Sequence, residues 1–99
     1  MSLLVKYTLR SADDHDAQVA AMTAFVANLK AEGVTQATYS CFTTNDPVQF
    51  FGIVEFEDDA GKQAFLDSAA FATYRETVGP TFANPPATTE ISGIASTFA

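Results

Sequence analysis

Apolar and polar side chains alternate near the start of the chain, over residues 3–10. Val5, Tyr7 and Leu9 fall on one side of this segment, and Lys6 and Thr8 fall on the other. A repeat of two residues is typical of a β-strand with one buried face. The segment therefore predicts a strand that begins the fold and turns its odd-numbered side chains toward a core.

The repeat then becomes helical and stays so to Glu32. Ser11 precedes Asp14 by three residues, which resembles the box of residues that starts many helices, and Gly33 stands where helices commonly end. The apolar residues between these ends recur at helical spacing: Val19, Met22, Phe25, Val26 and Leu29. We therefore expect a long helix that packs this stripe on the core.

Two further strands are predicted to form a hairpin. Residues 35–44 are rich in β-forming residues, residues 45–47 (Asn-Asp-Pro) favour a turn, and residues 50–56 follow as the second strand. That strand is largely apolar on both faces, with Phe50, Gly52, Val54 and Phe56 on one and Phe51, Ile53 and Glu55 on the other. A sheet with helices on one side normally shows water its other face. Apolar residues on both faces therefore predict that a second copy of the chain covers the outer face.

The rest of the chain predicts two more helices and a closing strand. Asp58 or Asp59 can cap a helix that runs to about residue 67 and turns Phe65 and Leu66 inward. Ser68 can cap a helix over residues 69–78, residues 81–88 are irregular at their prolines, and residues 89–97 alternate as a strand. The order β, α, β, β, α, β is that of a ferredoxin-like α+β fold with an antiparallel sheet. Two such sheets packed face to face form a dimeric α+β barrel.

The composition indicates one domain over residues 1–99 and argues against several functions. Twelve acidic and five basic residues give a net charge of −7, and the basic residues are scattered along the sequence. This balance disfavours binding to nucleic acid or to an anionic membrane. The start of the chain does not resemble a signal peptide and no apolar run is long enough for a membrane span, which predicts a cytoplasmic protein. Cys41 is the only cysteine, so neither an intrachain disulfide nor a cysteine-based metal site is expected.

Residues 49–75 carry a further pattern: a strand that ends in an aromatic residue, an acidic turn, a helix, a serine and a later aromatic residue. The positions that carry it are Phe56, Asp58, Ser68 and Phe71. This pattern resembles the central segment of the antibiotic-biosynthesis-monooxygenase-like family, the dimeric α+β barrel group. The chain departs from the family at two positions: Phe65 replaces a common His, and Val54 replaces a common Glu unless the register shifts by one residue to Glu55. Tryptophan, which the haem-degrading members use, is absent.

The resemblance implies a homodimer in which each subunit has a pocket between its sheet and its helices. In such a pocket the best-known members oxidise a phenolic or quinol compound with molecular oxygen, without metal or flavin. That chemistry needs a shielded apolar cavity and a group that helps to deprotonate the substrate. We therefore expect no cofactor and no metal, and leave the catalytic residue unassigned. Six residues are candidates for the pocket wall: Tyr7, Tyr39, Phe56, Phe65, Tyr74 and Arg75.

Other reactive side chains have simpler interpretations. His15 lies among three aspartates in the first turn of the first helix, which is typical of a solvated helix start. Cys41 is expected to be a small buried hydrophobe, and Asn84 lies in a proline-flanked loop that could reach a ligand or only connect two elements. Three functions stay open: a cofactor-independent monooxygenase, a non-catalytic homodimer that binds an apolar ligand, and a regulatory module that binds ligands at the boundary between subunits.

Overall fold

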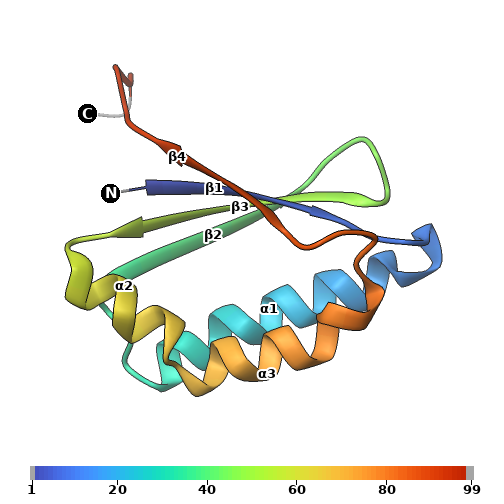
Figure 1. The fold of residues 1–99 in the computed structure, drawn as a ribbon, viewed down its shortest axis with the longest axis horizontal. Helices are drawn as coiled ribbons and strands as arrows, with labels where there is room; N and C mark the ends of the chain where they lie inside the picture. Colours follow the sequence, from blue (N-terminus) through green and yellow to red (C-terminus); the bar gives the residue numbers. More distant parts are fainter. Residues whose placement is uncertain (1, 98–99) are drawn as a thin grey trace.

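The computed structural model describes residues 2–97, which form a four-stranded antiparallel sheet with three α-helices against one of its faces (Figure 1). The strands are β1 (Ser2–Thr8), β2 (Ala37–Thr43), β3 (Gln49–Phe56) and β4 (Ala87–Ile91). The helices are α1 (His15–Ala31), α2 (Asp59–Leu66) and α3 (Ala69–Val78), with the short 3-10 helices η1 (Ala12–Asp14) and η2 (Gly79–Thr81). The strand order β2-β3-β1-β4 confirms the predicted ferredoxin-like α+β arrangement.

The core lies between the sheet and the helices. Antiparallel pairing of β1 with β3 sets Val5 opposite Gly52 and Tyr7 opposite Phe50, so that all four face the same side. Val5, Tyr7 and Leu9 are buried, as the alternation at the start of the chain predicts. Helices α1 and α3 lie side by side across this face, and α2 closes one end of it (Figure 1).

Capping side chains start the helices where the sequence predicts them. The Ser11 hydroxyl accepts a hydrogen bond from the backbone of η1, which leads directly into α1. The Asp58 carboxylate accepts one from the backbone of α2 at 2.8 Å, and the Ser68 hydroxyl accepts one from the backbone of α3 at 3.1 Å. Gly33 ends α1 with φ of 72°, a conformation that glycine adopts without a steric penalty.

The residues that α1 and α2 bury in the core differ in part from those predicted. The buried residues of α1 are Gln18, Met22, Phe25 and Leu29. Val19, expected on this stripe, is 39% exposed, because it lies about 100° around the helix from Gln18. Gln18 takes the inward position although it is polar, since its amide bonds the Tyr74 hydroxyl inside the core. Leu66, expected to face inward with Phe65, is 42% exposed and lies at the edge of the space between α2 and the sheet, whereas Phe65 is buried.

The last strand lies earlier in the chain than predicted. It covers Ala87–Ile91 instead of residues 89–97, and it begins directly after Pro86. Its register sets Ala87 opposite Lys6 and Ile91 opposite Ser2. Residues 92–97 therefore lie beyond the described start of β1, and they are exposed without strand structure in spite of their alternating pattern.

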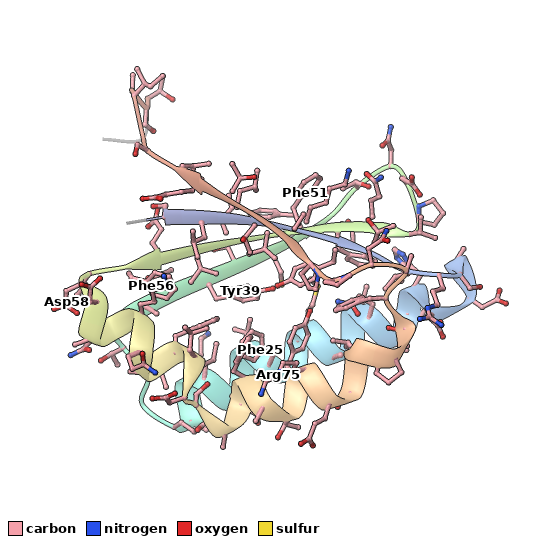
Figure 2. All side chains as sticks on the ribbon, in the orientation of Figure 1. Phe25, Tyr39, Phe51, Phe56, Asp58 and Arg75 are labelled. Atoms are coloured by element: carbon pink, nitrogen blue, oxygen red, sulfur yellow. The ribbon has the colours of Figure 1, made fainter. Side chains whose placement is uncertain are left out.

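The outer face of the sheet is apolar at its centre. Phe51 points away from the helices (Figure 2), and the register sets it opposite Phe42, which is 49% exposed. Leu4 and Ile53 form the next opposite pair on the same face, and both are half-buried. No helix among residues 2–97 covers these side chains, which agrees with the two apolar faces read from the sequence of β3.

Candidate functional site

A cavity of about 490 Å³ lies between the sheet and helices α2 and α3. The fold brings all six candidate residues together on its wall: Tyr7, Tyr39, Phe56, Phe65, Tyr74 and Arg75. The exposed residues of the wall mark the mouth, and most come from the two helices and the segment after η2: Arg10, Leu66, Arg75, Gly79, Ala83, Asn84, Pro85, Pro86 and Thr88. The inner wall is buried and largely aromatic.

Phe25 is the centre of the aromatic wall, although no sequence pattern distinguishes it from the other core residues of α1. Its ring stacks on Tyr74, with 4.6 Å between the ring centres and an interplanar angle of 14°. The rings of Tyr39 and Phe65 meet it at steeper angles, at 5.0 and 5.7 Å. Figure 2 shows Phe25, Tyr39 and Phe56 in the space between the sheet and the helices. Such stacked and edge-to-face contacts stabilise one arrangement of the rings.

All three tyrosines of the protein meet in this wall. The hydroxyl oxygens of Tyr7 and Tyr39 lie 3.0 Å apart, and Gln18 Nε2 donates a hydrogen bond to the Tyr74 hydroxyl at 2.9 Å. The rings of Tyr7 and Tyr74 meet edge to face, with 6.2 Å between their centres. Three phenols and one amide thus form a small polar cluster inside an otherwise apolar core.

Burial raises the pKa of each of these phenols above its usual range. Desolvation is the largest cause for Tyr7, and hydrogen bonding to Tyr39 and Tyr74 offsets part of it. For Tyr39 and Tyr74 desolvation is again the largest cause of the raised pKa, and the other tyrosines add to it. The three phenols therefore stay uncharged at neutral pH. They can donate or accept hydrogen bonds, but they do not supply a general base.

Gly52 makes room for the Tyr39 side chain. A Cβ atom at this position would lie 2.8 Å from the Tyr39 hydroxyl oxygen and 2.9 Å from a ring carbon. These distances are shorter than van der Waals contact, so any larger residue would displace the ring. The glycine in β3 is therefore part of the geometry of the hydroxyl cluster.

The charged part of the wall is entirely basic. Arg10, Lys62 and Arg75 line the cavity, and none of the wall residues is acidic. The Arg10 Nε donates a hydrogen bond to the Phe82 carbonyl oxygen at 2.8 Å, and the Arg75 guanidinium carbon lies 5.2 Å from the centre of the Phe71 ring. Three basic residues that are far apart in the sequence therefore lie on the wall of one cavity.

His15 and Cys41 lie outside this wall. His15 is half-buried instead of fully solvated, because its Nδ1 lies 2.8 Å from the Pro47 carbonyl oxygen and its ring packs 5.0 Å from that of Phe50. It joins the start of α1 to the hairpin loop. Burial raises the pKa of the Cys41 thiol, which keeps it protonated at neutral pH.

Neither a metal site nor a membrane span is found in the part of the chain that the structure describes. No three His, Cys, Asp or Glu side chains gather there as metal ligands, and none of its helices is long and apolar enough to cross a bilayer. Phe65 and Val54, at the positions where the family resemblance would place His and Glu, are both buried on the cavity wall. The wall consequently carries neither an imidazole nor a carboxylate.

The sequence matches no family model and no curated protein, but solved structures share its fold. A protein from Nitrosomonas europaea that bears the name of an antibiotic biosynthesis monooxygenase has a TM-score of 0.78 and 18% identity, over 96% of this chain and 100% of that one. One of the same name from Bacteroides thetaiotaomicron has a TM-score of 0.84 and 9% identity, over 100% and 93%. Rv0793 from Mycobacterium tuberculosis has a TM-score of 0.79 and 18% identity, over 97% and 96%.

The TM-scores establish a similar fold. Because the sequence identities are low, the chemistry of the site has to be argued from the residues of this chain. The chain has the α+β fold of the structures named antibiotic biosynthesis monooxygenases, in agreement with the resemblance read from residues 49–75.

Proposed function

We propose that the protein binds a small, oxygen-bearing aromatic compound of the phenol or quinol class in the cavity between its sheet and its helices. The observation that carries the proposal is the make-up of the wall, in which aromatic rings and three phenolic hydroxyls surround a space of about 490 Å³. Pockets for small molecules commonly measure about 300–1,000 Å³ and combine an apolar lining with a few polar groups. A ligand of two or three fused rings fits this description.

The hydroxyl cluster favours a ligand that carries oxygen. The contact between the hydroxyls of Tyr7 and Tyr39 uses one of the three phenolic protons. Because Gln18 is the donor to Tyr74, it takes up none of the three phenolic protons. The buried Gln18 Oε1 has no hydrogen-bond partner either, so at least one hydroxyl proton remains for an acceptor in the cavity. A buried donor without an acceptor costs about 1–3 kcal/mol, so a ligand oxygen that accepts this proton would stabilise the complex.

A matched pair of substitutions tests where the ligand binds. Val54 is buried on the cavity wall, whereas Val19 is 39% exposed on α1 and away from the wall. In calorimetric titrations with 2-naphthol, Val54→Phe should lower the affinity by about tenfold or more, because the larger ring occupies ligand volume. Val19→Phe should bind like the unsubstituted protein. Circular dichroism confirms that both variants fold. Equal affinities for the two variants, or no binding to the unsubstituted protein, would overturn the proposal.

The names of the structural neighbours favour a second function, oxidation of such a compound by molecular oxygen. In the oxidation of an anthrone to a quinone, the substrate supplies four electrons, one oxygen atom enters the product and the other leaves as water. Since the cavity wall has no imidazole or carboxylate, the substrate proton would have to pass to water, aided by the basic side chains. Oxygen uptake with anthrone in metal-free buffer tests this function. Uptake above the buffer rate that Val54→Phe abolishes would support it, and binding without uptake would favour a non-catalytic ligand-binding protein.

We also propose that two copies of the chain pack through the outer faces of their sheets. The outer-face pair of Phe42, which is 49% exposed, and the half-buried Phe51 supports this arrangement, because its burial would remove apolar surface from water at about 25 cal/mol per Å². Sedimentation equilibrium should give twice the chain mass of 10.6 kDa, and Phe51→Lys should shift the mass to that of one chain. Val19→Lys, on the exposed side of α1, is the control and should leave the dimer intact. A single-chain mass for the unsubstituted protein at micromolar concentration would contradict the dimer.

A further inference from the structure

We propose that the cavity selects an organic anion, an aromatic body with a carboxylate that Lys62 and Arg75 hold at the mouth. This inference rests on the proposed binding function and narrows it to a class of ligand. It follows from where the fold places the few basic residues of an acidic protein.

The charge of the wall is the reverse of the charge of the protein. The chain has 12 acidic and 5 basic residues, yet three basic residues and no acidic residue line the cavity. Three charged residues drawn at random from this chain would all be basic only about once in seventy draws. A net charge of −7 repels anions from most of the protein surface. The three basic residues of the wall make the cavity a local exception, where an anion is attracted.

The basic side chains of the wall also have no acidic partner in the described part of the chain. No carboxylate forms an ion pair with Arg10, Lys62 or Arg75 within residues 2–97. Arg10 is held in place by its hydrogen bond to a backbone carbonyl, whereas Arg75 lies beside the Phe71 ring with its nitrogen donors directed to no acidic group. A guanidinium and an ammonium without counter-ions are ready to bind a carboxylate.

The position of these cations fixes the orientation of the ligand. Arg75 is exposed and Lys62 half-exposed, and they come from α3 and α2, the two helices that flank the mouth. The deep wall contains apolar rings, and its phenols are uncharged. An ionised carboxylate would lose its hydration there without gaining a counter-charge. The aromatic body therefore enters first and the carboxylate stays at the mouth, where water and both cations reach it.

The test uses two ligands of the same shape, 2-naphthoate and its neutral amide 2-naphthamide, titrated into the full chain by calorimetry at neutral pH. Naphthoate should bind about tenfold more tightly, and Lys62→Gln and Arg75→Gln should each weaken its binding by about two- to fivefold, the range of partly exposed ion pairs. Neither substitution should change the affinity for naphthamide. Lys30→Gln removes the same charge from an exposed position on α1, away from the cavity, and should leave both affinities unchanged.

The outcomes separate this inference from the function on which it rests. Equal binding of naphthoate and naphthamide would overturn the anion selectivity and leave the aromatic pocket standing. Lys30→Gln could also lower the affinity for naphthoate as much as Arg75→Gln does. The preference for naphthoate would then come from the net charge of the protein, and the anion selectivity of the cavity would be overturned. If neither ligand binds, the proposed function and this inference fail together.

Discussion

The three core tyrosines, of which Tyr7 and Tyr74 are buried and Tyr39 is half-buried, make the stability of this protein fall steeply at alkaline pH. Burial holds the pKa of Tyr7, Tyr39 and Tyr74 above the ordinary value of 10.0 in the folded state. In the unfolded chain the same phenols lose their protons near pH 10. Above this pH the folded state binds more protons than the unfolded state, so the free energy of unfolding decreases as the pH rises. The stabilisation is fully present below pH 10 and is lost above it.

The size of the effect follows from the number of phenols. Each group contributes about 1.4 kcal/mol per pH unit once the pH is well above its unfolded pKa, so three groups give a limiting slope of about 4 kcal/mol per unit. Between neutral pH and about pH 11 the free energy of unfolding should fall by about 4 kcal/mol, a large part of the 5–15 kcal/mol typical of a domain. Tyr39→Phe should remove about a third of this dependence.

The assay compares phenolate absorbance with far-ultraviolet circular dichroism along an alkaline titration. In denaturant all the tyrosines should ionise near pH 10, whereas in the native protein phenolate should appear only together with the loss of helical signal. A Cys41→Ala background removes the thiol, whose raised pKa would add its own pH dependence. Phenolate absorbance that rises with a midpoint near pH 10 while the helical signal stays native would refute the burial of the hydroxyl cluster.

Three further substitutions test contacts around the site, each by urea unfolding at fixed protein concentration. Gly52→Ala should lower the free energy of unfolding by about 1–3 kcal/mol, since its Cβ would lie 2.8 Å from the Tyr39 hydroxyl. Gly93→Ala, whose Cβ meets nothing within 4 Å, is the control, and equal losses in the two variants would show that Tyr39 does not fill the space beside β3. Ser68→Ala should cost about 1 kcal/mol by removing the cap of α3, and an unchanged urea midpoint would argue against that cap. Glu32→Ala should cost a similar amount, about 1 kcal/mol, because this carboxylate accepts hydrogen bonds at 2.9 and 2.8 Å from two amides at the start of α3. Those two amides should then exchange faster with solvent, and unchanged exchange would argue against the contact.

Local signals in the sequence were sufficient to predict most of the fold. Alternation in β1 and β3, the turn at residues 45–47 and the caps at Asp58 and Ser68 all act over a few residues, and all reappear in the structure. The errors arose where distant contacts decide the outcome. Gln18 is buried because of a tyrosine 56 residues away, and the position of β4 is set by its pairing with Ser2–Lys6 of β1, at the other end of the chain.

The candidate site was predictable in its aromatic residues and less so in its polar ones. The family resemblance and the strand alternation selected six residues that the fold does place on one cavity wall. The clustering of the basic residues was missed, because Arg10, Lys62 and Arg75 are far apart in the sequence. Helical spacing carried a signal that could have found two of them: Lys62 precedes Phe65 by three residues, and Arg75 follows Phe71 by four.

The most direct test of the account is to locate a bound ligand by nuclear magnetic resonance. Intermolecular nuclear Overhauser effects between 2-naphthol and the side chains of the isotope-labelled protein report which protons lie close to the ligand. We predict contacts with Val54, Phe65 and Tyr39 on the cavity wall, and none with Phe51 on the outer face of the sheet. Contacts with Phe51 instead would place the ligand at the boundary between subunits and contradict a binding site between the sheet and the helices.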